Sequence, residues 1–370
     1  MQQSLQPNSL LQGGKYHIIE SLGQGGFGIT YLGEQTSLSR KVAIKEFFMK
    51  DLCNRDDATS HVSVGSEGSR EMVNRFREKF VKEAKSIARL VHPNIVRVID
   101  IFEENGTAYY VMEYCEGGSL SVRLRQQYPD GMPTELALKY IHQIASALDY
   151  IHQLKINHLD VKPANVMLNE RGDAVLIDFG LAKQYDAQTG QQTSSTPVGI
   201  SEGYAPMEQY KKGGVAQFSP TTDIYSLGAT LYKLVTGQTP PNANDILNDG
   251  LPELPASIPA SIAEAIRQSM QPRKIDRPQS IEAWLNLLDA EPVVTLWTRR
   301  KRLPMSKTFR RRRESVRLAL KRRKNVRRVK RQHARPKPRQ STKRAKRQNA
   351  RRRRRQHLPQ RNPGSGALLP

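Results

Sequence analysis

The sequence predicts an α+β fold of two lobes, a β-rich N-terminal lobe and a helical C-terminal lobe, followed by a disordered basic tail. Three observations support this prediction. Short β-branched runs separated by glycines and polar turns fill most of residues 16–113. Apolar residues at spacings of three and four dominate residues 114–288. The last part of the 370-residue chain is rich in Arg, Lys and Gln and has few aromatic residues.

The N-terminal lobe is expected to contain five strands and one helix. Its strands are predicted at residues 16–20, 29–32, 41–45, 95–102 and 108–113. A helix is predicted over residues 70–90, because apolar side chains recur there at helical spacing with charges between them. The polar, Gly/Ser-rich residues 54–70 are predicted as a loop.

The C-terminal lobe is predicted to be built mainly from helices. The apolar periodicity places them at residues 135–153, 220–236, 261–270 and 280–288. The globular unit is therefore expected to span residues 16–288, with lobes at 16–113 and 114–288, after an N-terminal extension of residues 1–15. Residues 289–370 are assigned to the tail.

The charge of the chain is strongly divided between these parts. Residues 298–370 hold 31 of the 59 Lys and Arg and one of the 35 acidic residues, so this segment carries +30. The rest of the chain carries −6. The tail lacks the apolar surface needed to fold alone. Its basic runs predict salt-dependent, non-specific contact with nucleic acid or with an anionic membrane, two partners between which the sequence does not choose.

Other features narrow the class of protein. Two cysteines, Cys53 and Cys115, cannot build a disulfide framework or a four-cysteine metal site. The N-terminus has no signal-peptide pattern, and no run reaches the eighteen apolar residues of a membrane-spanning helix. A cytoplasmic location is therefore expected.

A glycine-rich run, Gly23-Gln24-Gly25-Gly26-Phe27-Gly28, offers a backbone that phosphate oxygens could approach without meeting Cβ atoms. The same letters occur in dinucleotide-binding turns, but those open a helix. Here the glycines lead into Ile29-Thr30-Tyr31-Leu32, which has the composition of a strand. A glycine-rich hairpin is therefore the favoured prediction.

Three further motifs follow in a fixed order. Val42-Ala43-Ile44-Lys45 comes first, then His158-Leu159-Asp160-Val161-Lys162-Pro163-Ala164-Asn165, and then Asp178-Phe179-Gly180. Each is weak alone. Together with the glycine-rich run, in this order and spacing, they resemble the signature of the protein kinase family, and of its bacterial serine/threonine kinases in particular. The resemblance covers residues 16–288.

The resemblance implies an ATP site formed mainly by the N-terminal lobe. Lys45 would contact the α- and β-phosphates and pair with a helix glutamate, for which Glu83 is the first candidate and Glu78 the competitor. Met112 to Cys115 would form the hinge that meets adenine. The implied nucleotide-binding residues are Leu22, Gly23, Gln24, Gly25, Gly26, Phe27, Gly28, Thr30, Ala43, Lys45, Glu113 and Cys115.

The resemblance also implies the chemistry. Asp160 would accept the proton of the substrate hydroxyl, and Lys162 would reach the γ-phosphate. Lysine at this position is typical of the serine/threonine branch, so protein Ser and Thr residues are the implied substrates. Asn165 and Asp178 would hold Mg²⁺, which needs few protein carboxylates beside phosphate oxygens and water.

One position departs from the family pattern. Leu159 stands where these kinases usually have an arginine that receives an activation-loop phosphate. Leucine cannot bind a phosphate, so activation through this contact is not predicted. The loop hydroxyls that could still be modified are Thr189, Thr193, Ser194, Ser195 and Thr196.

Two scaffold features are implied as well. Glu208 would pair with Arg277 as a buried ion pair, and Asp223 would brace the backbone of the catalytic loop.

Two other functional classes remain open at this stage. The first is a scaffold that binds nucleotide without turnover, against which the intact Lys45, Asp160 and metal ligands argue. The second is a nucleic-acid-associated protein in which the tail dominates. The tail could also have arisen from a reading-frame change without a selected function, and the sequence indicates no oligomeric state.

Overall fold

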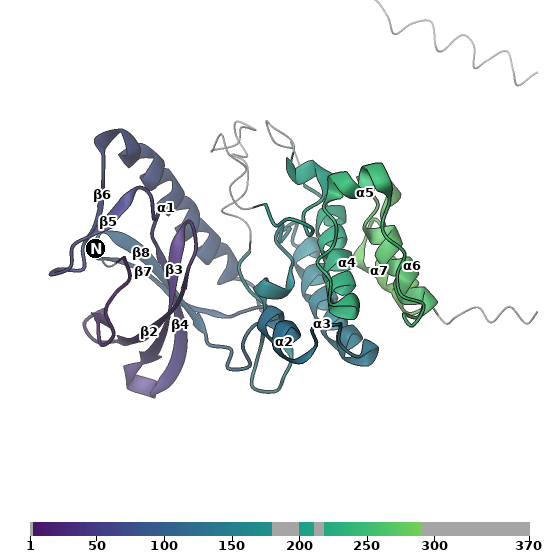
Figure 1. The fold of residues 1–370 in the computed structure, drawn as a ribbon. Coiled ribbons are helices and arrows are strands. Elements are labelled where there is room, and N and C mark those ends of the chain that lie inside the picture. The colour runs from purple at the N-terminus through teal and green to yellow at the C-terminus, as the bar shows by residue number, and fades with distance from the viewer. Residues whose placement is uncertain (1–2, 180–199, 211–217, 291–370) are drawn as a thin grey trace, which may run out of the picture. The chain divides into compact units, whose positions relative to one another are not determined.

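The protein is described by a computed structural model that covers residues 3–179, 200–210 and 218–290 (Figure 1). The chain divides into two units between Val293 and Val294, and all described residues belong to the first unit. Within the described ranges, no helix has both the length and the apolar composition needed to cross a membrane.

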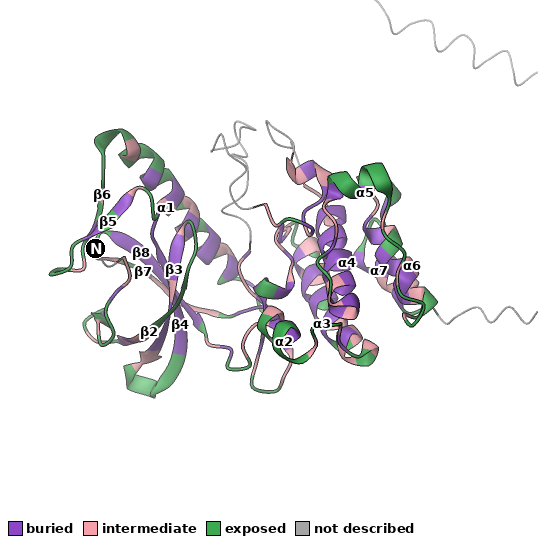
Figure 2. Cartoon of the chain, in the orientation of Figure 1, coloured by how far each residue is buried: buried purple, intermediate pink, exposed green. Residues whose placement is uncertain are grey.

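The N-terminal lobe is a six-stranded antiparallel sheet with the strand order β1-β2-β3-β4-β8-β7. The strands are β1 (Leu10–Leu11), β2 (Tyr16–Gln24), β3 (Gly28–Gln35), β4 (Arg40–Phe47), β7 (Val98–Glu104) and β8 (Thr107–Glu113). Five of them confirm the predicted strands. Strands β4 and β8 lie in the interior of the sheet, which agrees with the long buried runs along both (Figure 2).

Helix α1 (Glu67–Ile87) packs on this sheet and confirms the predicted helix. The ring of Phe80 lies 5.7 Å from that of Phe47 in β4 and 5.0 Å from that of Tyr110 in β8. The buried positions recur at spacings of three and four and include one acidic residue; they are Val73, Phe76, Phe80, Glu83, Ala84 and Ile87. A charged residue on the buried face of an amphipathic helix needs a partner.

The segment between β4 and α1 differs from the predicted loop of residues 54–70. It contains an antiparallel hairpin, β5 (Cys53–Arg55) with β6 (Val62–Val64), and α1 begins within the same range. The buried side chain of Val62 and the bond from its N–H to the carbonyl of Asn105, at 2.7 Å, attach the hairpin to the β7–β8 turn. Tertiary contacts of this kind give no periodic signal in so short a segment.

The N-terminal residues also belong to this lobe. Strand β1 pairs with β2, and the side chains of Leu5 and Leu11 are buried in the core. A two-residue strand is too short to be recognised from alternation. Residues 3–15 thus add an edge to the sheet.

In the described part of the C-terminal lobe, the structure has the four predicted helices and two further short ones. Its helices are α2 (Leu120–Gln127), α3 (Thr134–Gln153), α4 (Pro220–Thr236), α5 (Ala243–Asp249), α6 (Ala260–Ser269) and α7 (Ile281–Leu288). Helix α4 is buried on nearly all sides (Figure 2). It starts with a proline in its first turn and ends at Gly237 in the left-handed conformation, where a Cβ would meet the carbonyl oxygen of Pro129 at 2.1 Å.

A small hairpin carries the ends of two functional motifs. Strand β9 (Val166–Leu168) pairs with β10 (Ala174–Leu176). The backbone of Leu176 exchanges bonds with Asn94 and Val96, the segment that precedes β7, at 2.8 and 3.0 Å. Because β10 is held from both sides, the residues that follow it, including Asp178, start from a fixed point.

Candidate active site

The glycine-rich run forms the predicted hairpin between β2 and β3. Gly23 pairs with Thr30, and the N–H of Gly25 donates to the carbonyl of Gly28 at 2.8 Å. At Gly28 a Cβ would meet the carbonyl oxygen of Glu46 at 2.6 Å, so this glycine is required by close packing against β4. At Gly23 and Gly26 a Cβ would meet nothing within 4 Å. The bare backbone at these two positions is therefore not explained by contacts among the described residues, and it suits an external phosphate.

The register of the sheet aligns several predicted nucleotide-binding residues. Thr30 in β3 lies opposite Lys45 in β4, and Lys45 lies opposite Tyr110 in β8. Ala43, two residues before Lys45, pairs with Met112 near the end of β8. Leu22 and Gln24 lie near the end of β2 with exposed side chains, and Phe27 is half-buried. The sheet thus brings the glycine hairpin, the lysine and the hinge side by side.

The hinge follows directly from β8. The N–H of Glu113, the last residue of the strand, donates to the carbonyl of Arg97 at 3.0 Å. Cys115 is buried, and burial raises the pKa of its thiol to about 11. The thiol is therefore protonated and unreactive near neutral pH.

Lys45 is paired with Asp178, the first residue of the Asp-Phe-Gly motif, through a direct contact between Nζ and Oδ1. Burial would lower the pKa of Lys45, but the negative charges of Asp178 and of Glu83 outweigh it and raise this pKa. Glu83 is buried on α1, whereas its competitor Glu78 is exposed. These observations support Glu83 as the helix glutamate that acts on Lys45.

Asp160 stands at the centre of a dense set of donors. Its Oδ2 accepts hydrogen bonds from Lys162 Nζ at 3.0 Å and from Asn165 Nδ2 at 2.8 Å. Its Oδ1 accepts from the hydroxyl of Ser201 at 2.5 Å, and Lys162 Nζ also donates to that hydroxyl at 2.7 Å. The structure therefore brings Asp160, Lys162 and Asn165 together, as the motif predicts.

Ser201 is a site residue that was not expected from the sequence. It lies forty-one positions after Asp160, next to a region rich in Ser and Thr. No spacing rule distinguishes it from the neighbouring hydroxyls. Only the folded chain brings its Oγ to the carboxylate of Asp160.

Asp223 anchors the backbone of the loop that carries Asp160, as predicted. The fully buried carboxylate of Asp223, in the first turn of α4, accepts from the N–H groups of His158 and Leu159 at 2.8 and 2.7 Å. His152 donates to it as well, at 2.8 Å. Burial would raise the pKa of Asp223, but these donors lower it, so the carboxylate stays ionised.

Leu159 and Asp178 share an unusual backbone. Both adopt positive φ angles, 67° and 53°, which side chains other than glycine rarely do. Such residues cluster at functional sites, where the surrounding contacts hold the strained backbone. Leu159 is buried, and its aliphatic side chain has no charged group that could bind a phosphate. The loop hydroxyls from Thr189 to Thr196 lie outside the described residues.

The side-chain oxygens of Asn165 and Asp178 fit a magnesium ion bound with ATP. Asn165 uses its Nδ2 to bond the main-chain and side-chain oxygens of Asp160, which fixes the amide and directs its Oδ1 elsewhere. Asp178 contributes a carboxylate. Among the described residues, no cluster of three or more His, Cys, Asp or Glu side chains could hold a metal by itself. An amide and one carboxylate, completed by phosphate oxygens and water, form an environment that Mg²⁺ accepts.

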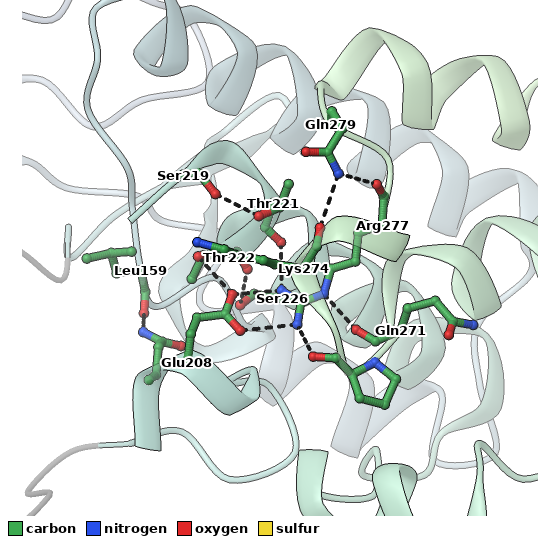
Figure 3. A network of polar contacts seen from close by, with 12 residues as sticks. Leu159, Glu208, Ser219, Thr221, Thr222, Ser226, Gln271, Lys274, Arg277 and Gln279 are labelled. Atoms are coloured by element: carbon green, nitrogen blue, oxygen red, sulfur yellow. Dashed lines mark hydrogen bonds and ion pairs between the residues drawn. The ribbon is translucent and has the colours of Figure 1, made fainter. Parts of the chain in front are cut away.

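The predicted ion pair between Glu208 and Arg277 is present and buried (Figure 3). Arg277 Nη1 and Nη2 donate to the two oxygens of Glu208 at 2.7 and 3.1 Å. The guanidinium also donates to the carbonyls of three residues, which are Thr221, Gln271 and Pro272. Glu208 lies in the 3-10 helix η4 (Met207–Tyr210), whose Gln209 donates to the carbonyl of Leu159 at 2.8 Å. The pair thereby holds the segment that contacts the catalytic loop.

Comparison with known proteins decides the family. The family model of the protein kinase domain matches residues 16–288 of this chain. The chain belongs to the protein kinase family. The match covers both lobes and every predicted site residue.

Individual relatives agree with this assignment. This kinase chain is 31% identical over 297 residues to a probable serine/threonine-protein kinase of Clostridium perfringens, and 34% identical over 248 residues to the serine/threonine-protein kinase PrkC of Bacillus subtilis. The alignments cover 77% and 67% of this chain, but only 40% and 34% of those two proteins. A solved structure titled "PpkA-294 apo form" matches with a TM-score of 0.68 and 30% identity, over 78% of this chain and all of its own.

Proposed function

We propose that the protein transfers the γ-phosphoryl group of ATP to Ser or Thr hydroxyls of other proteins. One observation carries the proposal: the hydroxyl of Ser201 donates to Asp160 at 2.5 Å while Lys162 contacts both groups. An aliphatic hydroxyl can therefore reach Asp160 in a basic, hydrogen-bonded environment. A substrate serine or threonine needs the same approach to its base.

The proposed reaction breaks one bond and forms another. The substrate oxygen attacks the γ-phosphorus, the bond from that phosphorus to the β-phosphate oxygen breaks, and ADP leaves. The hydroxyl proton passes to Asp160 Oδ1, the oxygen that accepts a hydrogen bond from Ser201 in the structure. No covalent enzyme intermediate is needed, so placement and charge neutralisation supply most of the rate.

The surrounding residues have separate tasks in this proposal. Lys162 holds the γ-phosphate next to Asp160, and Lys45 holds the α- and β-phosphates while Glu83 acts on it electrostatically. The backbone at Gly23, Gly25 and Gly26 covers the phosphates. Asn165 and Asp178 would hold Mg²⁺, which neutralises phosphate charge when bound.

A single substitution tests the proposal. Asp160→Asn removes the proton acceptor but keeps a side chain of the same shape, so we expect phosphoryl transfer to fall by about two orders of magnitude or more while ATP affinity changes little. Transfer is measured by single turnover with labelled ATP, and affinity by titration with a fluorescent ATP analogue. A wild-type protein that binds ATP but yields no phosphoprotein would instead establish a nucleotide-binding scaffold.

The basic segment of residues 298–370, which lies outside the described residues, is proposed as a contact for polyanions. Its charge of +30 contrasts with the −6 of the rest of the chain. Binding through it should weaken steeply with salt, because each phosphate contact releases a counterion. Removal of residues 298–370 should abolish binding to DNA and to anionic vesicles; binding that survives the deletion would contradict this assignment. A cytoplasmic location is part of the proposal, because the reaction consumes ATP.

A further inference from the structure

Glu46, the residue after Lys45, is fully buried on the opposite face of β4. Its carboxylate accepts three hydrogen bonds, each at 2.6 Å. Tyr31 in β3 and Arg55 in β5 donate to Oε2, and Tyr109 in β8 donates to Oε1. The donors come from both strands that flank β4 and from the β5–β6 hairpin. Glu46 therefore joins three parts of the lobe at the position next to the catalytic lysine.

Arg55 extends this network to the N-terminal residues. The buried guanidinium pairs with Glu46 and also donates to the carbonyls of Gln3 and Ser60 at 2.8 and 2.9 Å. It lies over the ring of Phe48 at 5.4 Å. The N–H of Leu5 donates to the hydroxyl of Tyr31 at 3.0 Å. Arg55 thus connects Gln3 and the β5–β6 hairpin to Glu46, on the face of β4 opposite to Lys45.

The network leads to the nucleotide side through two short routes. The N–H of Phe48 donates to the carbonyl of Phe27 in the glycine hairpin at 3.1 Å, and the ring of Phe27 stacks on Phe76 of α1 at 5.2 Å. The hairpin held by Arg55 also leads directly into α1, the helix that carries Glu83. Arg55 is therefore connected to both groups that surround Lys45 on the other face of the sheet.

We propose that Glu46 and Arg55 are positioning residues for phosphoryl transfer, which set Lys45, Glu83 and the glycine hairpin in their relative places. The inference rests on the proposed function. In a strand, a one-residue slip moves every side chain to the other face, so a carboxylate bound by three donors fixes Lys45 toward the nucleotide. A buried ion pair contributes little net stability compared with an apolar pair, but it tolerates few alternative arrangements.

The test separates positioning from stability by comparing two variants of the full chain: Arg55→Met, and the double variant that combines Arg55→Met with Glu46→Gln. We expect Arg55→Met to lower kcat about tenfold or more and to raise KM for ATP by a smaller factor, because Lys45 and the glycine hairpin hold phosphates while the hinge is untouched. In the double variant the unpaired carboxylate is gone, so thermal stability should recover in part. The kcat should not recover, because the methionine at position 55 cannot restore the contact between the β5–β6 hairpin and β4.

Leu288→Ala serves as the matched control. This buried residue of α7 lies in the C-terminal lobe, so its loss lowers stability without touching the network. All assays are run at a temperature at which each variant is folded by circular dichroism. The control should keep its kcat within about twofold of the wild type.

Hydrogen exchange supplies a readout independent of catalysis. Amides of α1 should exchange faster in Arg55→Met and in the double variant, and at the wild-type rate in Leu288→Ala. The proposal is overturned if kcat recovers together with stability in the double variant, or if α1 loosens while kcat stays at the wild-type value. A wild-type protein without activity would contradict the proposed function instead, and the exchange result would still report on α1.

Discussion

The protein has a buried arginine–glutamate pair in each lobe, and the two pairs are built differently. Glu208 is held by Arg277 through two oxygens and by one hydroxyl, that of Thr222. Glu46 is held by Arg55 through a single oxygen and by two phenols. The first pair depends on its arginine for most of its hydrogen bonds, whereas the second shares the carboxylate among three donors.

This difference shows that burial alone does not define the role of an ion pair. Without Arg277, Glu208 would keep one neutral donor among its present partners, so it would remain a poorly compensated buried charge. Without Arg55, Glu46 would keep the phenols of Tyr31 and Tyr109. The C-terminal pair should therefore matter more for stability, and the N-terminal pair more for the arrangement of the nucleotide side.

The largest expected effect is on the C-terminal pair. Arg277→Met should lower the free energy of unfolding by about 3–5 kcal/mol, because it leaves Glu208 charged and buried. Urea unfolding monitored by circular dichroism measures the loss. A change below about 1 kcal/mol would show that water or a rearranged side chain compensates Glu208, and the proposed contrast would fail.

Arg55→Met should cost less, about 2–3 kcal/mol, because two phenol donors remain on Glu46. The same unfolding assay gives the value, and the ratio of the two losses sharpens the comparison. If Arg55→Met proved as costly as Arg277→Met, the phenols would contribute little to holding the carboxylate.

The glycine hairpin offers a smaller and more local contrast. Gly28→Ala places a Cβ where the carbonyl oxygen of Glu46 lies 2.6 Å away, so it should cost about 1–3 kcal/mol. Gly26→Ala meets open space and should leave stability within about 0.5 kcal/mol. If Gly26 covers phosphates, its substitution should nevertheless weaken ATP binding, measured by titration. Equal stability losses in the two variants would contradict the packing argument.

The smallest expected effect is a pH dependence at His158. Burial lowers the pKa of this histidine from its ordinary value of 6.5, so the folded protein keeps it neutral where the unfolded chain binds a proton. The stability that it contributes is present above pH 6.5 and is lost as the pH falls toward the folded pKa. The slope for one proton is at most about 1.4 kcal/mol per pH unit.

His158→Gln should flatten this part of the pH profile. Urea unfolding at several values between pH 5 and pH 7.5 gives the slopes, and the difference between variant and wild type isolates His158 from His92, whose pKa burial also lowers. Identical slopes would mean that His158 is not kept neutral by the fold.

The sequence predicted the fold well where periodicity was long. The helices over residues 70–90, 135–153 and 220–236, and the strands around Lys45, appear where the apolar pattern placed them. The short elements β1, β5, β6, α2 and α5 were not predicted. The three strands have only two or three residues, and the two helices bury only two side chains each, which is too few to define a period. Their formation depends on what they pack against.

The sequence by itself determined which groups are present for chemistry and their order along the chain. It also indicated the pairing of Glu208 with Arg277 and the bracing by Asp223, because both residue sets fall within the family's motifs. Only the tertiary structure brought Ser201 to Asp160 and Arg55 to Glu46. Those contacts join residues whose spacing follows no local rule, since they depend on how separate elements pack, and packing is decided by the whole core at once.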